Sequence, residues 1–257
     1  MTLEEGIKLA ESGDIGAMIS LGDYYIQKKE SADDIEKAAE WFEKAAKHKV
    51  MYAIHMSVLT KKIQAHSGLL VADKVEMGTA FALDEWKSVY EWAAEELECI
   101  NNNVPGSEEI KISDAIQNFE EASYYFALCS HCVGKDEQAV ELVCNFDDVR
   151  SKILCAGARI QLAQTNSDYA SAAKLLMSVI EDSSYAAADK YAIEEEVYAT
   201  AGIQLSMMHR LLINDLDAAV SVLKFMENNV RREKNIQKVK EELNRYQKKL
   251  FGGYKYV

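Results

Sequence analysis

Residues 17–46 of this sequence read AMISLGDYYIQKKESADDIEKAAEWFEKAA, and they decide the fold class. Leu21, Gly22 and Tyr25 share one face of a predicted helix. A glycine in mid-helix costs about 1 kcal/mol relative to alanine, so its presence there indicates a packing requirement. Because glycine has no side chain, a second helix can approach closely at this point.

The second half of the stretch predicts the helix that makes this approach. Its apolar residues recur at spacings typical of one helix face. Small and large side chains alternate along that face, at Ala38, Trp41, Phe42 and Ala45. Such alternation suits two helices packed antiparallel.

The two helices together resemble a Sel-one-like repeat, a relative of the tetratricopeptide repeat. That family has a leucine–glycine pair and a tyrosine on its first helix, and lysine–alanine, two aromatics and lysine–alanine–alanine on its second. The matching residues are Leu21, Gly22, Tyr25, Lys37, Ala38, Trp41, Phe42, Ala45 and Ala46. The resemblance implies an all-α fold, a right-handed α-α superhelix that is a solenoid of antiparallel helix pairs.

The repeats predict a division of the chain. One clear copy covers 14–49, and a degenerate copy covers 50–101 with an insertion around Gly68–Gly78. Three asparagines, the single proline and a glycine then interrupt the helical pattern. We therefore expect a Sel-one-like sub-array over 1–104 and a degenerate tetratricopeptide-like sub-array over 105–257.

The second sub-array is predicted to be helical throughout. Its expected helices are 110–132, 136–144, 148–164, 169–180, 184–212, 215–226 and a basic capping helix over 230–251. Its last residues, Phe251–Val257, contain three aromatics. They could cap the final repeat, or they could be bound by another copy of the chain and so make a homo-oligomer.

Composition excludes several classes of function. The chain has a formal charge of −13, which argues against nucleic acid as a partner. No uncharged apolar run approaches the roughly 18 residues of a membrane span, and the N-terminal residues do not resemble a signal peptide. The five cysteines are scattered through helical sequence, which fits free thiols in a cytoplasmic protein.

No pattern of reactive residues predicts catalysis. Cys129 and Cys132 flank a histidine near the end of a helix, but a metal site would need further ligands, and Cys144 and Cys155 do not form a second such pair. Buried cysteines acting as small apolar residues are the simpler interpretation. We expect no enzyme activity, no metal and no cofactor.

The family resemblance implies a function in protein binding. In tetratricopeptide proteins the first helices of successive pairs line a concave groove that holds a peptide or helix of a partner. The equivalent positions are Ile19, Asp23, Ile26, Gln27, His55, Leu59, Lys62, Ile63, Tyr124, Leu128 and His131. We expect charge reversal at Asp23 or Lys62 to weaken binding without changing thermal stability. A regulatory protein that senses a peptide or small molecule in such a groove is the alternative.

Overall fold

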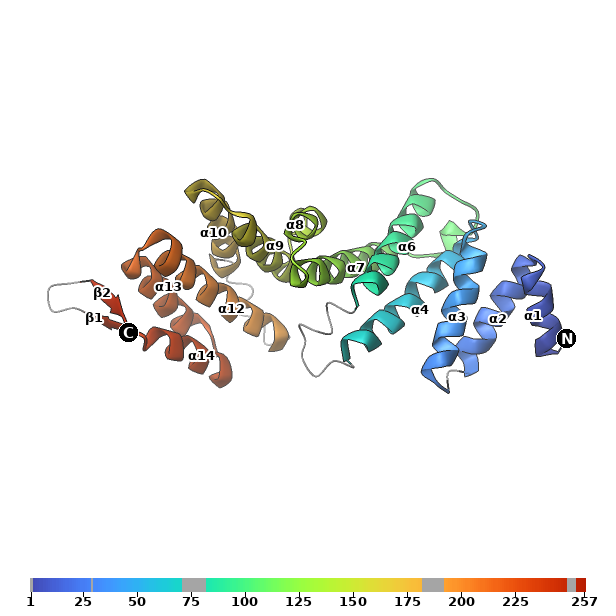
Figure 1. The fold of residues 1–257 in the computed structure, drawn as a ribbon, viewed down its shortest axis with the longest axis horizontal. Coiled ribbons are helices and arrows are strands. Elements are labelled where there is room, and N and C mark those ends of the chain that lie inside the picture. The colour runs from blue at the N-terminus through green and yellow to red at the C-terminus, as the bar shows by residue number, and fades with distance from the viewer. Residues whose placement is uncertain (1, 29, 71–81, 182–191, 249–252) are drawn as a thin grey trace. The chain divides into compact units, whose positions relative to one another are not determined.

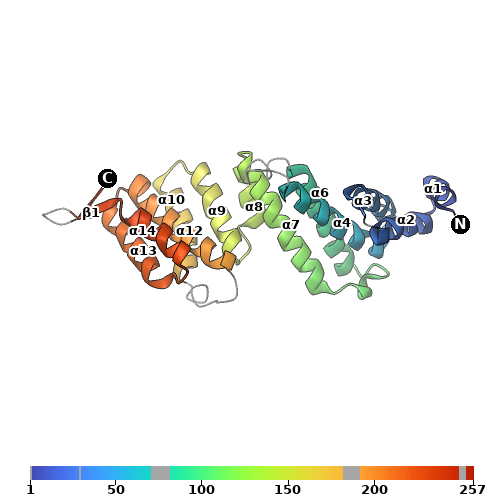
Figure 2. The ribbon, with the colours of Figure 1, turned by 90° about the horizontal axis from the view of Figure 1, so that it is seen from below.

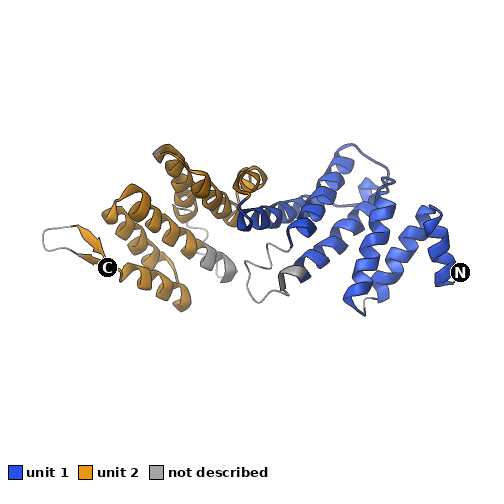
Figure 3. Ribbon diagram, in the orientation of Figure 1, with its two compact units in different colours: residues 1–134 blue, residues 135–257 orange. Residues whose placement is uncertain are grey.

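The computed structural model describes residues 2–28, 30–70, 82–181, 192–248 and 253–257. Apart from a short hairpin near the C-terminus, the regular elements of these ranges are helices, so the predicted all-α class is confirmed. The chain forms two compact units, residues 1–134 and 135–257, each with its own hydrophobic core (Figure 3). Within the described residues, no helix combines the length and the apolar character needed to cross a membrane.

Unit 1, residues 1–134, is a row of helices in chain order (Figures 1 and 2). Its elements are α1 (Leu3–Glu11), α2 (Ile15–Lys28), α3 (Ala32–Ala46), α4 (Met51–Leu70), α6 (Leu83–Asn101), the 3-10 helix η1 (Ser107–Glu109) and α7 (Ile112–Cys132). Each α-helix packs against the next one along the chain. The starts of α1, α2 and α3 have side-chain caps from Thr2, Asp14 and Ser31. At α1 the Thr2 and Glu5 side chains form a capping box.

The α2–α3 pair packs as the glycine predicts. A Cβ atom placed on Gly22 would lie 2.6 Å from the ring of Phe42, well inside a normal contact distance. Phe42 is fully buried, and Leu21, Tyr25 and Trp41 belong to the same core. The close approach of these two helices is thereby confirmed.

The expected boundary near Pro105 lies inside unit 1. The segment around it turns sharply, with Gly106 in the left-handed region at φ +88°, but α6 and α7 on its two sides pack against each other. The compact units instead divide between Gly134 and Lys135. Of the expected insertion at 68–78, residues 71–78 lie outside the described residues.

Unit 2, residues 135–257, begins with α8 and ends with the hairpin (Figure 1). Its elements are α8 (Asp136–Val143), α9 (Val149–Leu162), α10 (Asn166–Glu181), α12 (Ala192–Met208), the π-helix η2 (His209–Ile213), α13 (Leu216–Asn229), α14 (Glu233–Leu243), β1 (Tyr246–Lys248) and β2 (Tyr254–Tyr256). Asp148 and Asp215 cap α9 and α13, which begin within one residue of the expected helix starts at 148 and 215. The expected helix start at Ser183–Ser184 lies outside the described residues.

The start of α10 differs from the prediction. The helix was expected over 169–180, but it begins at Asn166. The reason is a pair of capping hydrogen bonds between Thr165 and Asp168. The backbone N–H of Asp168 donates to Thr165 Oγ1, and the backbone N–H of Thr165 donates to the Asp168 carboxylate at 2.9 Å. Thr165 is therefore the residue that caps the helix.

A second glycine contact joins α12 to α13. A Cβ atom on Gly202 would overlap the side chain of Met226, which is fully buried. Gly202 and Leu205 have the same spacing on α12 as Gly22 and Tyr25 on α2. Unit 2 therefore contains a helix pair that packs through a glycine. The repeat pattern did not predict this pair, because alanine stands before Gly202 where the family has leucine.

The predicted capping helix over 230–251 is wrong in its second half. α14 ends at Leu243, and Tyr246–Lys248 pairs antiparallel with Tyr254–Tyr256. Cross-strand packing explains the change, because the rings of Tyr246 and Tyr256 lie edge to face at 5.1 Å. The β2 strand packs on α13 of the same unit, and the Arg210 guanidinium lies 3.8 Å from the Tyr256 ring centre.

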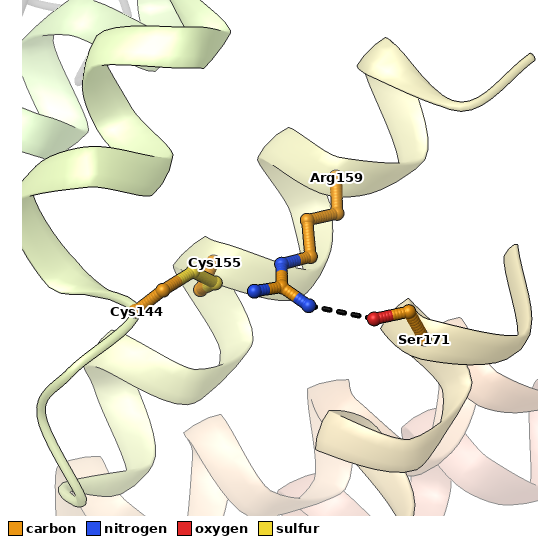
Figure 4. Close-up of a disulfide and its surroundings, with 4 residues drawn as sticks. All are labelled: Cys144, Cys155, Arg159 and Ser171. Atoms are coloured by element: carbon orange, nitrogen blue, oxygen red, sulfur yellow. Dashed lines mark hydrogen bonds between the residues drawn. A yellow bond between two sulfur atoms is a disulfide. The ribbon is translucent and has the colours of Figure 1, made fainter. Parts of the chain in front are cut away.

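The expectation of five free thiols is wrong for two cysteines. Cys144, just after α8, and Cys155, on the buried face of α9, form a disulfide (Figure 4). The reversal between α8 and α9 brings their Cα atoms to 5.4 Å, which is within the range of disulfides. Cys99, Cys129 and Cys132 are not part of a disulfide.

Candidate functional site

Four residues at helical spacing share one face of α4. They are His55, Leu59, Lys62 and His66. The face of α7 opposite them has the same spacing, with Asp114, Asn118, Glu121 and Tyr125. On α4 this face includes the predicted groove residues His55, Leu59 and Lys62, whereas the groove residues predicted on α7 were Tyr124, Leu128 and His131. We call the two opposed faces together the α4–α7 face.

Lys62 bridges the two helices. Its ammonium group donates to Asn118 Oδ1 at 3.0 Å and to Glu121 Oε2 at 2.6 Å. His66 lies 2.9 Å from the other oxygen of the same carboxylate. Burial acts to raise the pKa of Glu121, but the hydrogen bonds from Lys62 and His66 outweigh it, so the pKa is lowered. Glu121 therefore serves as a shared anion between α4 and α7.

This bridge corrects one expectation. Lys62 was predicted to present a free charge to a partner, but its charge is used inside unit 1. Asp23 is also engaged, since its carboxylate accepts a 2.6 Å hydrogen bond from the Tyr52 hydroxyl. Charge reversal at either residue will therefore disturb unit 1 itself, and neither is a clean test of binding.

An aromatic cluster lies beside the bridge. The rings of Trp86 and Tyr125 are stacked with their centres 4.4 Å apart, and His66 packs edge-on against both. Trp86 is fully buried. These rings are packed against one another, with Trp86 in the core and His66 and Tyr125 half-buried.

A buried carboxyl pairs with His55. Glu96 on α6 is fully buried, and its Oε1 atom lies 2.5 Å from His55 Nδ1. Its other oxygen is buried without a hydrogen-bond partner among the described residues. Glu96 was missed in the sequence, although its spacing from Val89 and Ala93 places it on the apolar face of α6. That spacing is the signal that could have found it.

The α4–α7 face opens into a hollow at one end. The hollow has a volume of about 310 Å³ and is lined by Tyr52, His55, Glu109, Ile110, Lys111 and Asp114. The ring of Tyr52 is 44% exposed, and its hydroxyl is held by Asp23. This hydrogen bond raises the pKa of Tyr52 to about 12, so the ring stays neutral at physiological pH.

The remaining predicted groove residues do not line this hollow. Ile19 and Ile26 are half-buried against the core of unit 1, and Gln27 and Ile63 are exposed. Leu59, Tyr124, Leu128 and His131 are half-buried. The structure thus brings His55 to the hollow, uses Asp23 and Lys62 to support the surrounding face, and leaves the others outside it.

The cysteine pair on α7 has no metal-site geometry. Burial raises the pKa of the Cys129 thiol to about 12, whereas Cys132 is exposed. Within the part of the chain that the structure describes, no group of three His, Cys, Asp or Glu side chains could hold a metal ion.

Unit 2 has a separate hollow near the disulfide. It has a volume of about 470 Å³, and Val140, Arg159, Thr165, Asp168 and Ser171 are among its lining residues. Arg159 lies one turn after Cys155, and its guanidinium donates a 2.6 Å hydrogen bond to the Ser171 hydroxyl (Figure 4). No carboxylate pairs with Arg159 among the described residues, so this cation has only a neutral acceptor.

No protein-family model, no curated protein and no solved structure matches this chain.

Proposed function

We propose that this chain is a non-enzymatic helical-repeat protein that binds a protein or peptide through the α4–α7 face of unit 1. The observation that carries the proposal is the hollow at the end of this face, which is lined by residues from α4, η1 and α7. A partly exposed tyrosine and exposed carboxylates border it, and such groups occur in surfaces that bind proteins.

The repeat architecture is part of the same proposal. Two helix pairs, one in each unit, pack through a mid-helix glycine against a fully buried side chain. This recurrence supports descent from Sel-one-like units arranged as a right-handed α-α superhelix. In that arrangement α2, α4 and α7 are the first helices of successive pairs and line one face.

The charged groups on the α4–α7 face favour binding over catalysis. Lys62 and His66 both contact Glu121, and His55 contacts Glu96. A catalytic site would need a nucleophile or an acid and base aimed at a substrate, with a further group to orient them. Here the paired groups hold α4, α6 and α7 together, so the remaining surface is suited to recognition.

Photo-crosslinking tests this assignment. Benzoylphenylalanine replaces Tyr52 in one variant and Tyr24 in another, because both tyrosines are 44% exposed but Tyr24 borders the α1–α2 side of the unit. We expect a discrete crosslinked partner at Tyr52 in cell extract and none of that mass at Tyr24. Equal crosslinking at both positions, or none at Tyr52, would remove the α4–α7 face as the binding site.

The hollow beside Arg159 favours a second candidate function, the sensing of a small molecule. A half-buried cation without a carboxylate partner suits a ligand that bears a carboxylate or phosphate. Native mass spectrometry of the purified protein tests it. A bound small molecule that is absent from an Arg159→Gln variant would support a sensor, and identical spectra of the two proteins would oppose it.

A further inference from the structure

The net negative charge of the chain is concentrated in unit 1. Residues 1–134 contain 24 Asp and Glu against 12 Lys, which is a formal charge of −12, whereas residues 135–257 carry only −1. A field of this sign attracts cationic partners and repels anionic ones. Charge complementarity therefore favours basic segments as partners of unit 1.

The hollow offers two carboxylates for such a segment. Glu109 and Asp114 are exposed, and among the described residues neither forms an ion pair. Their situation differs from that of Glu121, which is already shared by Lys62 and His66. The open end of the α4–α7 face is thus the place where carboxylates remain available.

Tyr52 adds an aromatic ring to the lining of the hollow. The Tyr52 ring is held through its hydroxyl by Asp23 and packs edge to face with Phe42 at 6.1 Å, and it is still 44% exposed. A cation over the face of an aromatic ring is attracted by the ring quadrupole, and a guanidinium can also stack on it. A fixed ring beside two carboxylates therefore suits a planar cation better than a compact one.

A lysine and a histidine, Lys111 and His55, also border the hollow. Lys111 is an exposed, flexible side chain, so it can turn to solvent when a ligand enters. His55 is held against the buried Glu96, whose carboxyl lies directly behind the imidazole. Glu109 and Asp114 therefore line the hollow, and the buried Glu96 lies behind His55.

We propose that this hollow binds an arginine side chain of the partner, with the guanidinium stacked on Tyr52 and hydrogen-bonded to Asp114 and Glu109. The inference rests on the proposed function of the α4–α7 face and names the partner chemistry that this face selects. Arginine is specified over lysine because the guanidinium is planar and donates several hydrogen bonds at once.

The test uses the full chain and a blocked pentapeptide that has one arginine between pairs of glycines. The control peptide carries citrulline, which has the same shape and no charge. Amide chemical shifts followed during titration should move first around Tyr52 and Asp114, with a dissociation constant at least about tenfold lower for the arginine peptide. Equal affinity of the two peptides would overturn the proposal.

Matched variants locate the site. Asp114→Asn and Glu109→Gln should each weaken the arginine peptide by about tenfold, whereas Glu120→Gln, which neutralises an exposed carboxylate elsewhere on α7, should not. Circular dichroism confirms that each variant is folded. If Glu120→Gln weakens binding as much as Asp114→Asn does, the peptide senses only the overall field of unit 1 and the proposal fails.

The outcome can be separated from that of the proposed function. Arginine binding at the hollow without crosslinking at Tyr52 would retain the arginine site and reject the protein-binding role. Crosslinking at Tyr52 without preference for arginine over citrulline would retain the protein-binding role and reject the arginine site.

Discussion

Replacing Gly22 with alanine should destabilise unit 1, although alanine is the better helix former. In an exposed helix the substitution would gain about 1 kcal/mol. Here the added Cβ atom would lie 2.6 Å from the Phe42 ring, whereas carbon atoms pack at about 3.5–4.0 Å. The ring is fully buried and rigid, so α2 and α3 must separate by roughly 1 Å. Overpacking of this kind costs about 1–3 kcal/mol. After the gain of about 1 kcal/mol in helix propensity is subtracted, we expect a net loss of about 1 kcal/mol.

The assay can be confined to unit 1. All three tryptophans lie in residues 1–134, so tryptophan fluorescence during urea unfolding reports this unit alone. Phe42→Leu provides the matched background, because a smaller side chain leaves room for the new methyl group. The Gly22→Ala penalty should shrink by at least about 1 kcal/mol in that background. A gain in stability from Gly22→Ala, or an unchanged penalty beside leucine, would refute the close packing.

Three further predictions follow from the contacts of each unit. Lys62→Met should lower the stability of unit 1 by about 1–3 kcal/mol, because it leaves the half-buried Glu121 without its main partner; an unchanged urea midpoint would contradict the bridge. The pKa of Glu121 is lowered in the folded state, so this carboxylate stabilises unit 1 fully above its unfolded pKa of about 4.3. That stabilisation is lost as the pH falls through the folded-state pKa. Glu121→Gln should therefore flatten the dependence of unfolding free energy on pH below about pH 5. Reducing the Cys144–Cys155 disulfide should cost unit 2 roughly 2–3 kcal/mol, and a Cys144→Ala variant should be insensitive to dithiothreitol in the same calorimetric scan. Tyr256→Ala should lower the melting temperature of unit 2 without changing oligomer size in light scattering, and a smaller oligomer would instead indicate an intermolecular tail.

The sequence was sufficient for the helices whose signals are local. Helical spacing and the caps at Asp148 and Asp215 depend only on nearby residues, and the structure has them where they were expected. The hairpin depends on pairing between residues ten apart, such as Tyr246 and Tyr256. Because the lysines and glutamates before it are good helix formers, the local pattern favoured a longer helix. The disulfide depends likewise on how α8 turns back onto α9.

For the candidate site, the sequence identified a face but not its contacts. Register alone placed His55 and Lys62 on one side of α4, and both do lie toward neighbouring helices. Whether a long side chain reaches across to another helix depends on interhelical distances that no local pattern contains. Glu96 shows the same limit, because its partner His55 is 41 residues away in the chain. A buried carboxyl can be suspected from its spacing, but its pairing needs the fold.

The charged residues in the middle of the α4–α7 face stabilise the fold, whereas those at the hollow are exposed to solvent. Lys62 and Glu121 satisfy each other across the middle of the face, so removing either leaves a partly buried charge and weakens the fold. Asp114 and Glu109 lie where this bridging ends, and their exposure means that neutralising them costs little stability. Substitutions in the middle should therefore change folding and binding together, whereas substitutions at the hollow should change binding alone. A variant such as Asp114→Asn that loses a basic partner at an unchanged urea midpoint is the result that would separate recognition from folding in this chain.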